Sequence, residues 1–468
     1  MYSIKPFVTA KIYKNEFHPS FGFIYDERMG TYYLLKGESA DLWGLILSNQ
    51  GANDLFKIAN TNDLKLKLTH FLFELYNKEF IDIDESIFAN TYSDNYKYLN
   101  KIYGSKGNFT YVDYAINTYI SKNNLLRILT LQLSYKCNLY CKHCFNPKNM
   151  PEYEISFETA KKAIDEAYNL GITEVCITGG ECTINENFLK IAKYVRNKHL
   201  RLTFLTNAQR LYDDKLFFDE IANIFPHRIE ISLYSMDPVI HDNLTGVSGS
   251  HNKTFTVIKK LREKNINVAV KCFQSSLNKN SYIEVTKFAK SIGAKITSDC
   301  VFVNNRDNNN YSCKLSEKDI EDFYYNQMNS DESFFFRPEF KKGDDLISQI
   351  FGNASLYLAP NSDISISSDS KYKLGNYKNN SLCDIVNNSL PKLREVCIRK
   401  NLKECFTQDY CSCCAFPYCI IAASYDAGEF QKSEILCEDA RAYYHALKRF
   451  RGKKNTSLFF AKFNGNSK

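Results

Sequence analysis

The sequence predicts an α/β protein in which a partial (β/α)6 TIM-like barrel is preceded by a winged-helix-like α+β domain and followed by a cysteine-rich domain. Six strand-like apolar runs alternate with amphipathic helical stretches between residues 126 and 303, which predicts βα units around a parallel sheet. The first 95 residues show a hairpin pattern and then two helical patterns. Beyond residue 345 the periodicity fades, and eight of the sixteen cysteines lie between Cys383 and Cys437.

In residues 1–95, the runs FGFIYD and TYYLLK flank the turn-forming ERMG and predict a β-hairpin. The stretches ESADLWGLILS and DLKLKLTHFLFELYN follow with helical periodicity, and a β-like IDID ends the region. The apolar faces of the two helices comprise Ala40, Leu42, Leu45 and Ile46, and Leu68, Leu72, Leu75 and Tyr76. Residues 96–125 are polar and rich in Tyr and Asn, which predicts a linker.

The barrel is expected in residues 126–310, with strands in ILTLQLS, EVCIT, RLTFLTN, RIEISLY, NVAVKCF and KITSDCVF. Its chemistry should lie at the C-terminal ends of these strands. An open Rossmann-like sheet is the competing topology, but no Gly-rich phosphate turn follows the first strand. We expect a bridging segment at 311–345, the cysteine-rich domain at 346–440, and a C-terminal helix and tail at 441–468.

The composition is that of a folded protein, with 44% hydrophobic and 24% charged residues among 468. The net charge of +7 is spread along the chain, so we expect no nucleic-acid partner. No stretch has the apolar length of a signal-peptide core or a membrane span, which predicts a cytoplasmic protein without membrane attachment. In a reducing compartment, clustered cysteines indicate metal or cluster ligands rather than disulfides.

The sharpest motif is CNLYCKHC, which places Cys137, Cys141 and Cys144 directly after the first barrel strand. Three thiolates at this spacing can bind three irons of a [4Fe-4S] cluster and leave the fourth iron open for another ligand. A zinc site is the alternative. It would need His143 as the fourth ligand, and a position between two cysteines makes a shared tetrahedron awkward.

This motif resembles that of the radical S-adenosylmethionine (radical SAM) enzymes, and further residues at strand ends extend the resemblance. The family uses a GGE motif after the second strand to seat the methionyl amino group of the cofactor. Polar residues on the third and fourth strands often contact its carboxylate or ribose. The positions that match here, and that the resemblance implies bind SAM, are Gly179, Gly180, Glu181, Thr206, Asn207 and Ser232.

The stretch LYSMDPVIHDNLTGVSGS resembles peptide-modifying members that carry a C-terminal SPASM domain. Within it we expect structural roles for His241 and Asp242. The resemblance implies one auxiliary [4Fe-4S] cluster with the ligands Cys397, Cys405, Cys411 and Cys437. Cys414 also matches a family ligand, but Gln349 and Ser367 stand where its partner cysteines are expected, so a second auxiliary cluster is not expected.

Eight further cysteines have no ligand role in this resemblance. We expect them to be packing residues, with Cys182, directly after GGE, as the one of most interest. A second site or substrate-facing thiols remain alternatives for the C-terminal ones. The eight are Cys176, Cys182, Cys272, Cys300, Cys313, Cys383, Cys413 and Cys419.

The N-terminal region resembles the PqqD-like recognition element of ribosomal-peptide maturases, in which a leader peptide adds as a strand to a sheet edge. An unrelated winged-helix-like domain is the alternative. The resemblance therefore implies a radical SAM peptide maturase of the sactipeptide or ranthipeptide type that uses SAM, the first cluster and an auxiliary cluster. An electron donor such as flavodoxin or ferredoxin would serve it.

The expected product is a thioether from a Cys sulfur to a carbon of a precursor peptide. A carbon–carbon crosslink, an anaerobic sulfatase-maturing or small-molecule radical enzyme, and a non-catalytic zinc-rich binding module are the alternatives.

Overall fold

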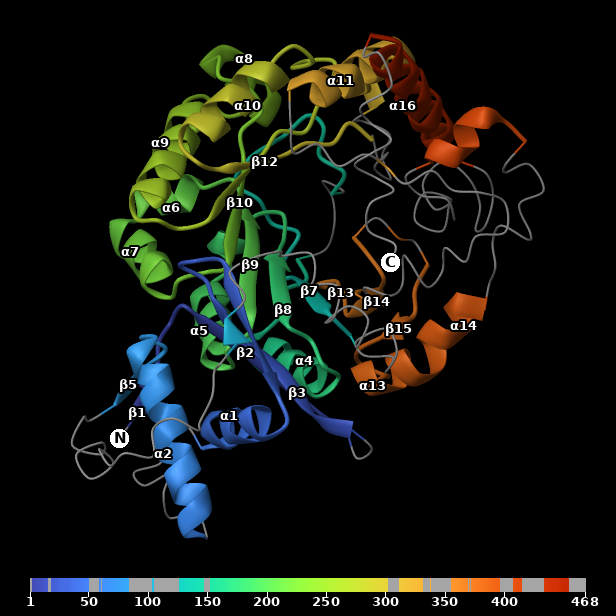
Figure 1. The fold of residues 1–468 in the computed structure, drawn as a ribbon. Helices are drawn as coiled ribbons and strands as arrows, with labels where there is room; N and C mark the ends of the chain where they lie inside the picture. Colours follow the sequence, from blue (N-terminus) through green and yellow to red (C-terminus); the bar gives the residue numbers. More distant parts are fainter. Residues whose placement is uncertain are drawn as a thin grey trace.

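The computed structural model describes residues 2–15, 18–49, 59, 61–83, 103–104, 126–146, 152–301, 311–330, 337, 355–368, 370, 372–395, 407–414 and 433–453. Figure 1 shows an N-terminal unit below a large sheet, with the C-terminal helices beside that sheet. In the described part of the chain no helix is both long enough and apolar enough to span a bilayer.

The N-terminal unit is built on an antiparallel sheet of order β2-β3-β4-β6, comprising Val8–Asn15, His18–Asp26, Thr31–Lys36 and Tyr103–Gly104. The predicted hairpin is confirmed as β3 and β4, and its turn is closed by Asp26, whose carboxylate accepts from the backbone N–H of Arg28 at 2.9 Å. The two predicted helices are confirmed as α1 (Glu38–Ser48) and α2 (Asn62–Asn77). A separate pair joins β1 (Tyr2–Ile4) to β5 (Ile81–Ile83).

The helices α1 and α2 cover one face of this sheet with a core of aliphatic and aromatic side chains centred on Trp43 and Leu72. The other face carries a smaller aromatic cluster of Tyr13, Phe23, Tyr25 and Tyr32. The edge strand β4 pairs with β6 at only two positions, Tyr33 with Gly104 and Leu34 with Tyr103. Apart from Tyr103 and Gly104, the predicted linker lies outside the described residues.

The central sheet contains six parallel strands in the order of the sequence, β7 to β12. They are Ile128–Gln132, Glu174–Thr178, Arg201–Thr206, Arg228–Ser232, Val268–Lys271 and Lys295–Thr297. The six predicted strands and their parallel arrangement are therefore confirmed. A doubly wound Rossmann sheet reverses its strand order near the centre. The six strands run without a reversal, as in a singly wound partial barrel.

Alternation along these strands separates a helix-facing side from a lumen-facing side. Val175, Ile177, Ile229 and Ile231 belong to the core shared with the surrounding helices. Those helices are α4 (Phe157–Asn169), α5 (Phe188–Asn197), α6 (Gln209–Asp213), α7 (Lys215–Asn223), α8 (Pro238–Thr245), α9 (Ser250–Glu263) and α10 (Tyr282–Ser291). The intervening strand residues, which are mostly polar, face the lumen, so the interior can hold a polar ligand.

The C-terminal region adds strands to this same sheet. β13 (Ser355–Leu358) pairs in parallel with β7, and β14 (Asp363–Ser365) and β15 (Gly375–Asn376) continue antiparallel. The sequence had assigned this stretch to the cysteine-rich domain. Its apolar face joins the barrel core through Leu356 and Leu358, which accounts for the pairing. Short helices α13 (Leu382–Asp384) and α14 (Leu390–Glu395) follow.

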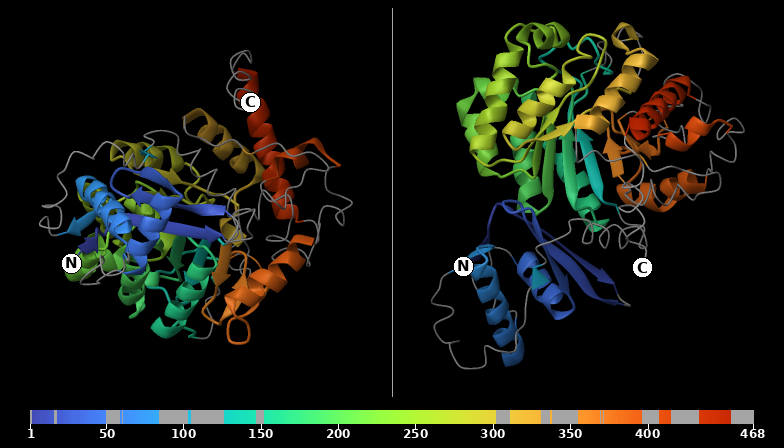
Figure 2. Two further views of the ribbon diagram at one scale, coloured as in Figure 1. Left: turned by 60° about the horizontal axis from the view of Figure 1, so that its bottom comes forward. Right: turned by 45° about the horizontal axis from the view of Figure 1, so that its top comes forward.

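Two longer helices, α11 (Glu317–Ser330) and α16 (Glu434–Lys453), pack side by side (Figure 2). Tyr324 donates its hydroxyl hydrogen to Asp439 at 2.5 Å, and the guanidinium of Arg337 lies 2.7 Å from the same carboxylate. Because Asp439 is buried, these two contacts hold α16 against α11.

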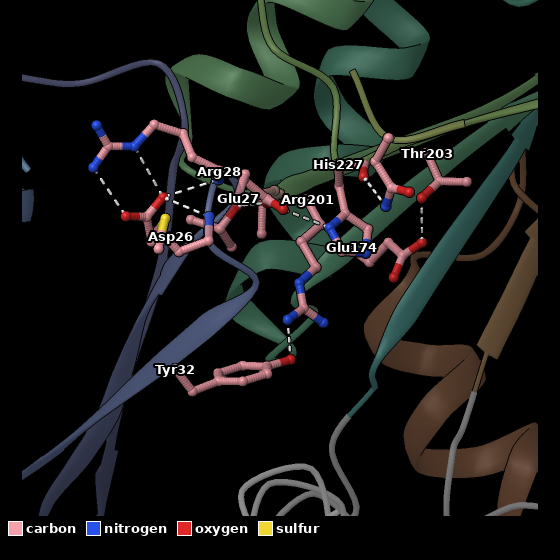
Figure 3. Close-up of polar contacts among 12 residues, drawn as sticks. Asp26, Glu27, Arg28, Tyr32, Glu174, Arg201, Thr203 and His227 are labelled. Atoms are coloured by element: carbon pink, nitrogen blue, oxygen red, sulfur yellow. Dashed lines mark hydrogen bonds and ion pairs between the residues drawn. The ribbon is translucent and has the colours of Figure 1, made fainter. Parts of the chain in front are cut away.

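A charged network joins the N-terminal unit to the N-terminal ends of the barrel strands (Figure 3). The Glu27 carboxylate lies 2.6 Å from His227 Nδ1 and 3.8 Å from Arg196, and it accepts from the Thr9 hydroxyl at 2.6 Å. Arg201 donates to the Tyr32 hydroxyl. Burial alone would raise the pKa of Glu27, but His227, Arg196 and Arg201 hold it below its ordinary value. The N-terminal unit thus closes the end of the barrel opposite the C-terminal strand ends.

Candidate active site

The cysteine loop follows β7 and is fixed by backbone contacts to the end of α8. Tyr140 N–H donates to Thr245 C=O and Lys142 N–H donates to Leu244 C=O, both at 2.9 Å. Gly246 ends α8 with a φ of +72°, and a Cβ there would lie 2.9 Å from the carbonyl oxygen of Tyr140. Glycine is required because the loop passes so close to a left-handed residue.

The GGE segment lies against the start of the same loop. Gly180 N–H donates to Ser134 C=O at 2.7 Å, and Glu181 N–H donates to Lys136 C=O at 2.8 Å. A Cβ on Gly180 would lie 2.3 Å from the oxygen of Lys136 and 2.4 Å from that of Tyr135. The space beside Gly180 is thus filled by the backbone that carries Cys137. Gly179 is less crowded, since its nearest neighbour, the oxygen of Ser134, would be 3.1 Å away.

Glu181 connects the ends of three strands. Its buried carboxylate accepts from the hydroxyls of Thr183 at 2.5 Å and Thr206 at 2.7 Å, and from Asn207 N–H at 2.6 Å. Burial raises the pKa of Glu181, while the hydrogen bonds from Asn207 and Thr183 oppose that rise. The Asn207 amide continues the chain of contacts to Asn138 Oδ1 at 2.7 Å, beside Cys137. Five of the six positions expected to bind SAM therefore converge on the cysteine loop.

The sixth position, Ser232, ends β10 on the lumen side, and a nearby residue that the motif analysis missed, Tyr234, contacts the cysteine loop. The Tyr234 ring meets the ring of His143 at 4.7 Å between centroids, and Ser232 and Cys141 both belong to its electrostatic environment. Burial raises the pKa of Tyr234 well above its usual value. The two-residue alternation that places Ser232 in the lumen places Tyr234 there as well, and this was the available signal.

His143 also belongs to the site. Its ring stacks on Phe273 with 5.2 Å between centroids and meets Tyr234 edge-on at 4.7 Å. Its Nδ1 atom is buried, with no hydrogen-bond partner among the described residues. Burial, aided by the charges of Lys271 and His241, lowers the pKa of His143 to about 4, so the ring is neutral at physiological pH.

The structural roles expected for His241 and Asp242 are confirmed. His241 Nδ1 accepts from Tyr234 N–H at 3.2 Å. The Asp242 carboxylate accepts from Gly249 N–H, the Ser250 hydroxyl and His251 N–H at 2.6 to 2.9 Å, and so caps the N-terminus of α9.

The residues present fit a cluster bound through three thiolates. Partial enclosure raises the pKa of Cys137 to about 11, with smaller contributions from the charges of Glu181 and Cys144. Within the described ranges, no three His, Cys, Asp or Glu side chains converge closely enough for a single metal ion. Ligands of a four-iron cluster bind separate irons and so lie farther apart than those of one zinc. Cys137, Cys141 and Cys144 would hold the cluster, and the cradle formed by Gly179, Gly180 and the Glu181 network lies beside it.

The auxiliary-cluster cysteines are only partly described. Cys411, Cys414 and Cys437 are half-buried, the first two in or just after the 3-10 turn Asp409–Cys413 and the third in the first turns of α16. Tyr444 links α16 to that turn by a hydrogen bond to Asp409 at 3.2 Å. Cys397, Cys405 and Cys419 lie outside the described residues.

The remaining cysteines divide by exposure. Cys182, Cys272, Cys300, Cys313 and Cys413 are buried, as expected for packing residues, while Cys383 is exposed. Cys176 is half-buried and alternates with the core residues Val175 and Ile177, so it faces the lumen rather than the core. Because β8 presents every second residue to the interior, the expectation that Cys176 is a packing residue stays a prediction.

A parallel partial barrel with three thiols on the loop after its first strand is typical of enzymes that bind both a four-iron cluster and SAM. Residues 131–281 match the sequence profile of the Radical SAM superfamily, and the chain therefore contains a radical SAM domain. The superfamily implies a [4Fe-4S] cluster and SAM as cofactors.

Curated relatives match the same region. The antilisterial bacteriocin subtilosin biosynthesis protein AlbA of Bacillus subtilis is 31% identical over 173 residues, which cover 36% of this chain and 38% of that protein. The AdoMet-dependent heme synthase of Methanosarcina barkeri is 26% identical, over 37% of this chain and 50% of that protein. A PqqA peptide cyclase of Bradyrhizobium diazoefficiens is 23% identical, over 35% of this chain and 43% of that protein. The chain thus spans half or less of the length of these relatives.

Solved structures share the fold over a longer stretch. Streptococcus suis SuiB bound to its precursor peptide SuiA superposes with a TM-score of 0.54 at 15% identity. The match covers 93% of this chain and 100% of the SuiB chain. The enzyme anSMEcpe with bound AdoMet and the Cp18Cys peptide gives a TM-score of 0.52 at 16% identity, covering 70% of this chain and 98% of that one. At these identities the likeness concerns the fold alone.

Proposed function

We propose that this chain is a radical SAM maturase that modifies a ribosomally synthesised precursor peptide. The observation that carries the proposal is the extent of the fold likeness. SuiB, crystallised with its precursor peptide, matches 93% of this chain, whereas anSMEcpe matches 70%. A likeness of that extent takes in the N-terminal unit as well as the barrel. Two relatives of the domain, AlbA and the PqqA peptide cyclase, are named for peptide products.

In this proposal the N-terminal unit binds the leader of the precursor as an added strand. The receiving edge is β4, which pairs with only the two residues of β6. Tyr33 on this edge meets Phe80 edge-on, at 5.0 Å between ring centroids, so an added strand would lie next to the end of α2. Backbone hydrogen bonds would provide affinity, and side-chain pockets beside the strand would provide selectivity.

The site's own residues then position and enclose the reacting groups. Tyr234 and His143 close the inner side of the cysteine loop, and the Glu181 network holds the ends of β8 and β9 against it. When bound, the cluster and SAM supply a 5′-deoxyadenosyl radical that abstracts a hydrogen atom from the peptide. The lumen would shield that carbon from water.

We propose a thioether as the product bond. The peptide loses two hydrogens: one leaves as the abstracted atom, and the other leaves the thiol as a proton. An auxiliary cluster, which Cys397, Cys405, Cys411 and Cys437 would hold, would accept the remaining electron. Cys411 and Cys437 are half-buried, which suits a ligand, while Cys413 is buried among aromatic side chains. Cys411→Ala should therefore lower the iron content by one cluster, and Cys413→Ala should not. Equal iron loss from both would contradict this ligand set.

The decisive experiment incubates the anaerobically reconstituted protein with SAM, a reductant and the peptide encoded beside its gene. Formation of 5′-deoxyadenosine, a mass loss of two hydrogens and loss of an alkylatable thiol are expected, and Cys141→Ala should abolish all three. Mass loss with every thiol still alkylatable would replace the thioether by a carbon–carbon crosslink. Near-stoichiometric zinc without labile sulfide in the reconstituted protein would contradict its assignment as a radical SAM enzyme.

A second candidate is a small-molecule radical enzyme, because the heme synthase and a probable GTP 3′,8-cyclase of Thermococcus kodakarensis also match the domain. Removing the leader from the peptide distinguishes the two functions. A maturase should lose affinity for the leaderless peptide, whereas an enzyme that does not use the N-terminal unit for substrate should bind both forms equally.

A further inference from the structure

A tyrosine of the C-terminal region contacts the end of the first barrel strand. Tyr357 lies on β13, which runs beside β7 (Figure 1), and its neighbours Leu356 and Leu358 belong to the helix-side core. The side chain of Tyr357 therefore faces the lumen. Its hydroxyl donates to Gln132 Oε1 at 2.5 Å, and both side chains are buried. Gln132 is the last residue of β7 and leads into the segment that carries Cys137.

This contact continues as a chain of hydrogen bonds to both halves of the site. Gln132 Nε2 donates to Asn146 Oδ1 at 3.3 Å, and Asn146 Nδ2 donates to the carbonyl oxygen of Gly179 at 3.5 Å. Asn146 follows Cys144 on the cysteine loop, and Gly179 begins the GGE segment. Each amide accepts at its oxygen and donates at its nitrogen, so the hydroxyl at one end sets the orientation of both amides.

The chain of hydrogen bonds acts on the far end of the cysteine loop. Backbone hydrogen bonds from Tyr140 and Lys142 fasten the middle of the loop to the end of α8. Asn146 joins the part of the loop beyond Cys144 to the barrel wall and to GGE. The placement of the Cys144 thiol relative to GGE therefore depends on the two amides and, through them, on Tyr357.

We propose that Tyr357 is a positioning residue for SAM binding. Its hydroxyl orients the amides of Gln132 and Asn146, and these hold the cysteine loop against GGE. Without the hydroxyl, Gln132 Oε1 is buried with one donor fewer, and both amides are free to turn. The strand β13 thus contributes to a site whose sequence motifs lie between residues 137 and 232. The proposal needs the radical SAM domain alone, so its test stands whether or not the substrate is a peptide.

The experiment compares Tyr357→Phe with the control Tyr377→Phe in the reconstituted full-length protein. Both changes remove one hydroxyl from a buried tyrosine of the C-terminal region, but the Tyr377 hydroxyl donates to Glu166 on the outer helix α4, at 3.1 Å. Equilibrium dialysis measures SAM binding, and electron paramagnetic resonance records the reduced cluster before and after SAM is added. Iron content and the melting temperature establish that each variant is folded and loaded.

Tyr357→Phe should weaken SAM binding by about 3- to 10-fold, the effect of losing one buried hydrogen bond. It should also alter the change in g values that SAM causes in the spectrum of the loaded cluster. Tyr377→Phe should match the parent protein in both measurements. A contribution of Tyr357 to folding alone would lower the melting temperature and leave the SAM-dependent spectrum of the loaded protein unchanged.

A further pair of variants tests whether the tyrosine acts through the amides. Asn146→Ala removes the amide at the far end of the chain of hydrogen bonds. Once that amide is gone, the Tyr357 hydroxyl has nothing left to orient on the loop. The double variant Tyr357→Phe/Asn146→Ala should therefore lose no more SAM affinity than Asn146→Ala alone.

Two outcomes overturn the proposal. In one, either the SAM dissociation constant or the SAM-dependent spectrum of Tyr357→Phe equals that of Tyr377→Phe. In the other, the losses of the two single variants add in the double variant, which would show that Tyr357 affects SAM binding by a route other than Asn146.

Discussion

The replacement Gly180→Ala tests whether the GGE segment positions the cysteine loop. An added Cβ would lie 2.3 Å from the carbonyl oxygen of Lys136 and 2.4 Å from that of Tyr135. Ordinary contacts begin at 3.4 Å, so the loop and GGE must separate by about 1 Å. Both neighbours are backbone atoms, and no side-chain rotation can relieve the clash.

Forced overpacking of this kind costs about 1–3 kcal/mol. We expect much of that cost to fall on the geometry of Cys137, which follows Lys136 directly, and hence on SAM binding. The predicted result is a SAM dissociation constant raised by about tenfold or more, together with a lower iron content after reconstitution. Equilibrium dialysis and iron and sulfide determination measure the two quantities.

Two other glycine replacements, with less crowded Cβ positions, serve as controls. Gly179→Ala brings its Cβ to only 3.1 Å from Ser134 and should weaken SAM binding much less, while Gly452→Ala meets nothing within 4 Å and should have no effect. If Gly180→Ala bound SAM as tightly as Gly179→Ala, the close approach of GGE to the cysteine loop would not matter for the site, and the reasoning would fail.

Three further predictions concern the N-terminal unit and its contact with the barrel. Glu27→Gln leaves Arg196 and His227 without their buried carboxylate and should destabilise the fold by about 3–5 kcal/mol in urea unfolding. The control Glu79→Gln breaks an exposed ion pair and should cost less than about 1 kcal/mol. Equal losses of stability in the two variants would contradict a buried network. Burial lowers the pKa of His199 to about 4, so the unfolded chain takes up a proton below about 6.5 that the folded chain refuses. The free energy of unfolding should therefore fall by at most about 3 kcal/mol from pH 6.5 to 4. His199→Asn should remove this contribution to the pH dependence of stability, since Asn tolerates the positive φ at that position. Parallel pH profiles of the variant and the parent protein would refute this prediction. Replacing Tyr103 and Gly104 together by proline removes the β6 donors that pair with β4 and should raise leader affinity in fluorescence anisotropy, whereas a lower affinity would show that β6 is part of the docking surface.

The sequence by itself predicted the radical SAM domain and its cysteine loop, because that information is local. Cys137, Cys141 and Cys144 lie within eight residues on one loop, and the GGE segment is continuous. Strand and helix periodicity was enough to place all six barrel strands, since each buries one regular apolar face. The side chains expected at the strand ends do meet, since parallel strands bring their C-terminal ends to one edge.

Only the tertiary structure decided the contacts that depend on register and on distant segments. Glu27 meets His227 across 200 positions of sequence, and β13 adds to β7 although the sequence assigned it to another domain. Ser232 and Lys271 become neighbours only through the register of β10 and β11, which the local sequence does not show. A local motif can specify which atoms bind a cofactor. The environment of those atoms depends on packing between segments that the sequence keeps apart.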